Sequence, residues 1–199
     1  EYNPDEMAFY YFKGMAEFQK HDIDAALETF KKGVGQIKED SDPEIVSDFY
    51  AILGDILHEK GKASEAFAAY DSCLKWKADN YGALNNYAYY LSVANKDLPR
   101  AEQMSYKTIK AEPNNATYLD TYAWILFQQK RYEEAKIYID QAIRSDSTLT
   151  GVVKEHAGDI YAMTGDIDKA LEFWQQSLKG GNQSAVLKKK IQLKKYVAK

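Results

Sequence analysis

Apolar residues recur along the whole chain with the spacing of an amphipathic helix. In the run 118–142, apolar or small residues occupy relative positions 0, 3, 4 and 7 of a first segment that begins at Leu119. A second segment begins at Ala135 and carries such residues at positions 0, 4 and 7. Each set lies on one side of a helix. The polar pair Lys130-Arg131 separates the two segments, so the run predicts two helices joined by a short turn.

The same hairpin pattern occurs five times. Its clearest marker is a small residue in the first helix, followed 12 or 13 residues later by an alanine in the second. These pairs are Gly14/Ala26, Gly54/Ala66, Ala88/Ala101, Ala123/Ala135 and Gly158/Ala170. Small facing residues allow two helices to approach closely, and bulky neighbours fill the gaps beside them. The chain is therefore expected to be built from repeated helical hairpins.

This spacing resembles the tetratricopeptide repeat pattern W-x2-L-G-x2-Y…A-x3-F…P. In the run 118–142, the Leu, Gly and Tyr positions of that pattern are held by Tyr122, Ala123 and Leu126. The resemblance covers nearly the whole chain. It implies an all-α fold, a right-handed α-solenoid of about five helical hairpins closed by a capping helix. The expected single domain has repeats over about 7–38, 47–80, 81–115, 116–150 and 151–183, and a capping helix over 184–199.

Two segments depart from the regular repeat. The acidic stretch 39–44 lengthens one spacing, and Ser or Asp before Pro43 indicates a solvated turn that starts a helix. Calcium binding is the alternative for this stretch, but the EF-hand spacing and its glycine are missing. In the capping helix, Val186, Leu187, Ile191 and Leu193 form one apolar side and six lysines cover the remainder. Those lysines indicate that the helix caps the last repeat and exposes its charged side to solvent. The alternative is that the lysines contact anionic lipid or nucleic acid.

Composition excludes several classes of protein. A formal net charge of −4 argues against general nucleic-acid binding, which needs a basic surface. No apolar run approaches the roughly 18 residues needed to span a membrane. Cys73 is the single cysteine, so no intrachain disulfide forms, and a small buried thiol is expected there.

The resemblance also implies a binding surface. In tetratricopeptide proteins the first helices line a concave wall, and partners are contacted mainly from repeat positions 2, 5, 9, 12 and 13. Carried over to this chain, the candidate partner-binding residues are Tyr11, Met15, Asp48, Asp55, His58, Asn85, Tyr89, Asp120, Trp124, Phe127, Glu155 and Asp159. All such positions together hold six carboxylates and no lysine or arginine. We therefore expect a partner, a peptide or protein segment, with basic and apolar residues.

Two of these residues have a simpler alternative explanation. Asp48 is expected in the first turn of a helix, where a carboxylate is favoured in any case. Trp124 could pack beneath the neighbouring repeat instead of facing a partner.

Nothing in the sequence indicates catalysis. His21, His58 and His156 are scattered over three repeats, and none has a metal-ligand spacing. Neither a glycine-rich phosphate loop nor G-x-S-x-G occurs. The protein is expected to be no enzyme and to need neither metal nor cofactor.

The runs 119–124, 131–135 and 155–159 resemble the LDTxAW, RYEEA and EHxGD runs of bacterial repeat proteins. Such proteins are often exported to the envelope, some as lipoproteins, which implies a periplasmic or outer-membrane-associated location. Pro4 stands where a preceding repeat would close, so the chain is expected to be part of a longer protein. Two alternative functions are self-association into a homo-oligomer and an accessory repeat domain of a larger envelope protein.

Overall fold

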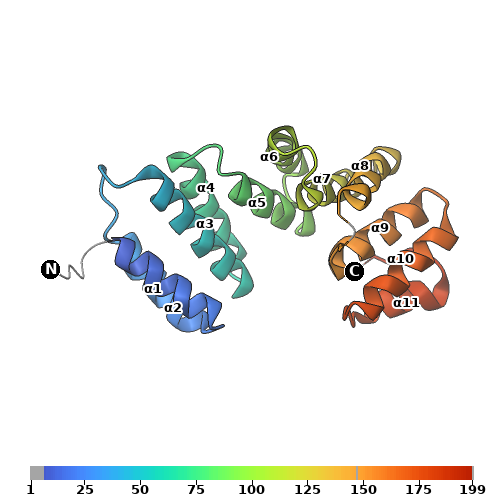
Figure 1. The fold of residues 1–199 in the computed structure, drawn as a ribbon, viewed down its shortest axis with the longest axis horizontal. Coiled ribbons are helices and arrows are strands. Elements are labelled where there is room, and N and C mark those ends of the chain that lie inside the picture. The colour runs from blue at the N-terminus through green and yellow to red at the C-terminus, as the bar shows by residue number, and fades with distance from the viewer. Residues whose placement is uncertain (1–6, 147, 199) are drawn as a thin grey trace. The chain divides into compact units, whose positions relative to one another are not determined.

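The computed structural model describes residues 7–146 and 148–198, which contain eleven α-helices and no strand (Figure 1). The helices are α1 Met7–Gln19, α2 Ile23–Val34, α3 Pro43–Glu59, α4 Ala63–Trp76, α5 Tyr81–Val93, α6 Leu98–Ala111, α7 Ala116–Gln128, α8 Tyr132–Ser145, α9 Gly151–Met163, α10 Ile167–Lys179 and α11 Ala185–Leu193. The predicted all-α fold is confirmed. Odd-numbered helices α1 to α9 are the first helices of the hairpins, and even-numbered ones are the second. Pro4 lies outside the described residues.

The chain divides into two compact units, residues 1–87 and 88–199, with the boundary inside α5. We call them the N-terminal and C-terminal units. The core of the N-terminal unit includes the fully buried rings of Phe30 and Phe49. The core of the C-terminal unit includes Leu126 and Trp174. Each unit is built from the same hairpins, whose repeats contact mainly their neighbours, and the single domain stays a prediction.

The close contact within each hairpin depends on the residue four positions after the second-helix alanine. In three hairpins that residue is an aromatic ring lying directly over the first-helix glycine, namely Phe30 over Gly14, Tyr70 over Gly54 and Trp174 over Gly158. A Cβ atom on these glycines would lie 2.3 to 2.9 Å from the nearest atom of the covering ring. In the other two hairpins Ser105 or Ile139 replaces the ring, and alanine replaces the glycine. The space that the second helix leaves therefore decides between glycine and alanine.

The acidic stretch before α3 forms the turn and helix start that were predicted. Asp42 Oδ1 accepts hydrogen bonds from the backbone N–H groups of Glu44 at 2.8 Å and Ile45 at 3.3 Å, and Pro43 is in the first turn. The helix consequently begins before residue 47. Asp48 is in its second turn, so the first-turn position expected for Asp48 is wrong.

The capping helix is shorter than the range 184–199 expected for it. It ends at Leu193 because Lys194 adopts a left-handed backbone conformation with φ 51°. Residues 195–198 belong to no helix. Lys190 is buried rather than solvated, and Leu193 is 45% exposed. The prediction that all lysines of this helix face solvent is therefore wrong for Lys190.

Cys73 is a buried thiol, as predicted. Its Sγ lies 3.2 Å from Ser47 Oγ, and burial raises the pKa of the thiol to about 11. The thiol is consequently protonated at neutral pH and is a poor nucleophile.

Candidate functional site

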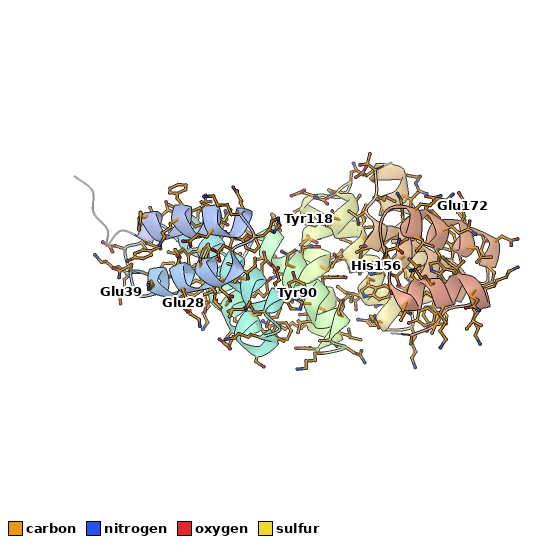
Figure 2. All side chains as sticks on the ribbon, turned by 90° about the horizontal axis from the view of Figure 1, so that it is seen from below. Glu28, Glu39, Tyr90, Tyr118, His156 and Glu172 are labelled. Carbon is orange, nitrogen blue, oxygen red and sulfur yellow. The ribbon has the colours of Figure 1, made fainter. Side chains whose placement is uncertain are left out.

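In the C-terminal unit, aromatic rings from three first helices lie together. Trp124 on α7 stacks against His156 on α9, with ring centroids 4.0 Å apart, and against Phe127 at 4.9 Å. The ring centroid of Tyr89, on α5, lies 6.1 Å from that of His156. We call the surface formed by Tyr89, Trp124, Phe127, His156 and Asp159 the aromatic face. Figure 2 shows that His156 lies among the helices, whereas Glu28 and Glu172 project outward from second helices.

Asp120 is engaged by a histidine from the next hairpin. His156 Nδ1 lies 3.0 Å from Asp120 Oδ1 and 3.1 Å from Oδ2, and both side chains are buried. The pair links α7 to α9 beside the stacked Trp124 ring. Trp124 and Phe127 are themselves only 6% and 4% exposed. These three predicted partner contacts therefore also belong to the core of the unit.

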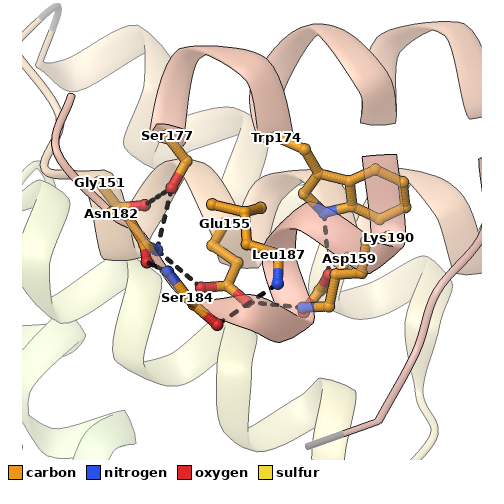
Figure 3. A network of polar contacts seen from close by, with 9 residues as sticks. All are labelled: Gly151, Glu155, Asp159, Trp174, Ser177, Asn182, Ser184, Leu187 and Lys190. Carbon is orange, nitrogen blue, oxygen red and sulfur yellow. Dashed lines mark hydrogen bonds and ion pairs between the residues drawn. The ribbon is translucent and has the colours of Figure 1, made fainter. Parts of the chain in front are cut away.

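Lys190 on α11 inserts its amine between two carboxylates of α9 (Figure 3). Its Nζ donates to Glu155 Oε1 and to Asp159 Oδ2, each at 2.7 Å, and the side chains of all three are nearly inaccessible. Asn182 donates to Glu155 at 2.8 Å, and the Trp174 indole N–H donates to Asp159 at 2.9 Å. Burial raises the pKa of Asp159, although Lys190 acts in the opposite direction. Two carboxylates of the predicted acidic wall, Glu155 and Asp159, are thus paired with a lysine of the same chain.

The segment 194–198 covers part of the aromatic face. The Tyr196 ring packs edge-to-face on Phe127, with centroids 5.3 Å apart, and Lys190 Nζ lies 5.6 Å from the centre of the same ring. A cavity of about 210 Å³ remains beside it, lined by Tyr89, Trp124 and residues 196–198 among others. Burial raises the pKa of Tyr89 to about 12, with Asp120 and Glu155 adding to the effect.

In the N-terminal unit, most candidate residues are accessible. Asp48 is exposed, whereas Tyr11, Met15 and His58 are half-buried. Asn85 is only 6% exposed, and its side-chain amide donates to Asn86 Oδ1 at 3.3 Å. The four accessible residues lie on α1 and α3, the two complete first helices of this unit.

Asp55 has a structural partner of the same kind as Asp159. Each follows the glycine of its hairpin, and each accepts a hydrogen bond from the aromatic ring that covers that glycine. The donors are the Tyr70 hydroxyl for Asp55 and the Trp174 indole N–H for Asp159. Burial raises the pKa of Asp55, while the hydrogen bonds from Tyr70 and Asn86 act to lower it. Both carboxylates therefore hold their own hairpins together.

The direction of this pKa shift makes Asp55→Asn an informative substitution. A carboxyl whose pKa is higher in the folded chain than in the unfolded chain stabilises the fold while protonated. That stability is lost as the pH rises through the folded pKa. Asparagine stays neutral and keeps an oxygen for Tyr70. We therefore expect the free energy of unfolding at pH 7 to rise by about 1 kcal/mol.

Urea unfolding at pH 7 and near pH 4 measures this effect. The gain from Asp55→Asn should shrink at the lower pH, where the wild-type carboxyl becomes protonated. Asp40→Asn, which changes an exposed carboxylate in the loop before α3, is the matched control. A gain that is equal at both pH values, or a clear loss at pH 7, would contradict the inferred cost of the buried charge.

The sequence-based prediction missed His156 of the aromatic face, and it missed Lys190 and Tyr196, which pack against that face. A signal existed for Lys190, since it falls between Leu187 and Ile191 on the apolar side of its helix, where a lysine needs a buried partner. His156 carried no such signal. Its role depends on α7 and α9 lying together in space.

The described residues contain no group of three or more His, Cys, Asp or Glu side chains arranged to hold a metal ion. None of their helices combines the length and the apolar character required to cross a bilayer.

Comparison with protein families gives two matches. The model described as a tetratricopeptide repeat-like domain matches residues 90–196, and a tetratricopeptide repeat model matches residues 47–80. Together these matches include hairpins from both units.

Known proteins of this architecture are similar to the chain. Stress-induced-phosphoprotein 1 of Caenorhabditis elegans is 25% identical over 120 residues, which are 57% of this chain and 36% of that protein. The chain thus matches little more than a third of that relative's length. Among solved structures, PilF of Pseudomonas aeruginosa has a TM-score of 0.71 at 20% identity, covering 91% of this chain and 80% of the other. YrrB, described as a tetratricopeptide protein with an unusual peptide-binding site, has a TM-score of 0.67 at 16% identity, covering 93% and 91%. At these identities the two structures share the helical-repeat fold with this chain.

Proposed function

Because the chain belongs to the tetratricopeptide repeat-like family, we propose that it is a protein-interaction scaffold that binds a peptide or protein segment on its first helices. The preferred segment combines basic and apolar residues. The peptide-binding site named for YrrB, which has the same fold, supports this assignment. The function requires no catalytic group, in keeping with the scattered histidines of the chain.

One observation carries the proposed chemistry of the partner. In the C-terminal unit, first-helix carboxylates hold the amine of Lys190, and a first-helix phenylalanine holds the ring of Tyr196. Acidic and aromatic residues on these helices therefore accept a cation and an aromatic ring side by side. A partner that carries the same two kinds of side chain is complementary to such positions.

In the N-terminal unit, Asp48, Met15 and Tyr11 are accessible to a partner, although Asp48 Oδ1 also accepts a hydrogen bond from Asn80 Nδ2 at 2.9 Å. Asp48 offers an exposed negative charge on α3, and Met15 on α1 offers a flexible apolar side chain that adapts to different shapes. Tyr11 on α1 adds a half-buried ring, which is apolar except for its hydroxyl group. We assign the first contact with a partner to this surface of α1 and α3.

Selection of twelve-residue peptides from a random library by the full chain tests the assignment. We expect the selected peptides to be enriched in lysine or arginine together with aromatic or aliphatic residues. Asp48→Lys should weaken the best peptide about tenfold, because like charges oppose each other across the contact. Fluorescence anisotropy at low and high salt measures the change.

Asp40→Lys is the matched control for this experiment, since it reverses an exposed charge in the loop before α3 that is not one of the candidate contact positions. It should change the peptide affinity by less than about twofold. Enrichment of acidic peptides, or equal losses for the two charge reversals, would count against the proposed function.

We further assign the protein to the bacterial envelope. This assignment depends on the resemblance of the runs 119–124, 131–135 and 155–159 to exported repeat proteins. An export signal encoded upstream of residue 1 would support it. A gene that encodes no export signal would contradict it.

A further inference from the structure

We propose that residues 194–198 act as an internal ligand, which occupies the aromatic face as a partner's segment would and must leave before such a segment binds there. The external segment that replaces it is extended, with lysines directly before an aromatic residue. This inference deepens the proposed function and rests on it, because it assumes that first helices bind polypeptide segments.

The first observation is the path of the segment. The left-handed conformation of Lys194 ends α11, and the Lys195 N–H donates to the Lys190 carbonyl at 3.3 Å. The chain then continues without helical structure to Ala198. An irregular segment that follows a helix end and packs by its side chains can occupy a surface that another polypeptide segment would use.

The second observation is what the segment contacts. Tyr196 packs on Phe127 of α7, and it shares the lining of one cavity with Tyr89 of α5 and His156 of α9. The segment therefore contacts α7, two hairpins away in sequence from α11, and borders a cavity that α5 and α9 also line. Partners are expected to contact these same helices.

The third observation is that the segment fits incompletely. The indole Nε1 of Trp124 is buried and has no acceptor among the described residues. The Trp124 side chain is one of those that line the cavity of about 210 Å³ beside residues 196–198. A buried donor without an acceptor costs about 1–3 kcal/mol. A longer segment that fills the cavity with an apolar side chain and directs a carbonyl oxygen at Trp124 would bind better than residues 194–198 do.

Charge favours the same class of ligand. Burial raises the pKa of the Tyr196 hydroxyl, and the carboxylates of Asp159 and Glu155 add to that effect. Their negative potential thus reaches the position of the ring even with Lys190 in place. Lysines beside the aromatic residue of a ligand, such as Lys194 and Lys195 beside Tyr196, lie in a favourable field.

The test uses a chain that ends at Leu193 and a fluorescently labelled synthetic peptide with the sequence of residues 192–199, QLKKYVAK. We expect the truncated chain to bind this peptide in trans. The full chain should bind it at least about tenfold more weakly, because a tethered copy competes at an effective concentration near millimolar. The same peptide with alanine at the position of Tyr196 is the ligand control, and it should bind the truncated chain at least about tenfold more weakly.

A second variant covers the case in which truncation disturbs folding. Tyr196→Asp in the full chain keeps its length and should release the segment, so this variant should bind the labelled peptide as the truncated chain does. Circular dichroism confirms that each variant is helical. The proposal would be overturned if the full chain bound the labelled peptide as tightly as the two variants do. It would also be overturned if the alanine peptide bound as tightly as the peptide with tyrosine, or if neither helical variant bound the labelled peptide.

The two proposals fail separately. Loss of the Asp48-dependent peptide binding would overturn the proposed function and leave binding of QLKKYVAK by the truncated chain intact. Failure of QLKKYVAK to bind would overturn the internal-ligand proposal while library peptides still bound α1 and α3.

Discussion

Lys190→Met is expected to lower the free energy of unfolding at pH 7 by about 3–5 kcal/mol, the cost of removing one partner from a buried ion pair. Lys190 is 1% exposed, and its amine contacts both Glu155 and Asp159 at 2.7 Å. Methionine has a similar length but no charge. The two α9 carboxylates would then be buried beside each other without the ammonium group.

The loss should depend on pH in a defined direction. Burial already raises the pKa of Asp159, and removal of Lys190 takes away a group that lowers it. A carboxyl with a raised pKa in the folded state contributes stability only while protonated, and loses it as the pH rises through that pKa. The deficit of Lys190→Met should therefore be largest near neutral pH and shrink as the pH falls toward about 4.

Urea unfolding followed by tryptophan fluorescence at pH 7 and pH 5 measures the deficit. Lys189→Met, which removes an exposed lysine from the adjacent position of α11, should change stability by less than about 0.5 kcal/mol. If the deficit of Lys190→Met were the same at both pH values, the lost interaction would be packing and not charge.

Gly158→Ala is expected to cost about 3 kcal/mol, at the upper end for overpacking a core. The added Cβ would lie 2.3 Å from Trp174 Cδ1 and 2.4 Å from its Nε1, and 3.0 Å from the Ala170 backbone oxygen. Trp174 is fully buried, so its ring has no space into which to move. Displacing the ring would also break its hydrogen bond to Asp159.

A matched pair of controls separates the clash from general effects of the substitution. Gly82→Ala in α5 places its Cβ no closer than 3.7 Å to Asn80 Oδ1, and it should stabilise the helix by about 0.5–1 kcal/mol. In a Trp174→Ile background, which copies the Ala123/Ile139 hairpin, Gly158→Ala should cost less than about 1 kcal/mol. An unchanged cost in that background would show that the ring is not the cause.

Much of the fold could be predicted because the relevant signals are local. The 3.6-residue period, the recurring small residues and the Asp42-Pro43 helix start act within one turn or one hairpin. They predict the hairpins, the buried Cys73 and a helix start at Pro43, whereas the repeat register places Asp48 one turn too early in that helix. The end of α11 was predicted less well. Its apolar positions continue to Leu193, but the backbone of Lys194 turns away so that Tyr196 reaches Phe127.

The sequence alone determined that this chain forms helical hairpins of the tetratricopeptide kind, because the spacing of small and large residues within a hairpin leaves few other ways to pack. Only the tertiary structure decided which first-helix acids stay available. Asp120 is held by His156 from 36 residues away, and Glu155 and Asp159 are held by Lys190 from 35 and 31 residues away, whereas Asp48 remains exposed. Such pairs form between side chains distant in sequence, and no local period encodes which cation reaches which carboxylate.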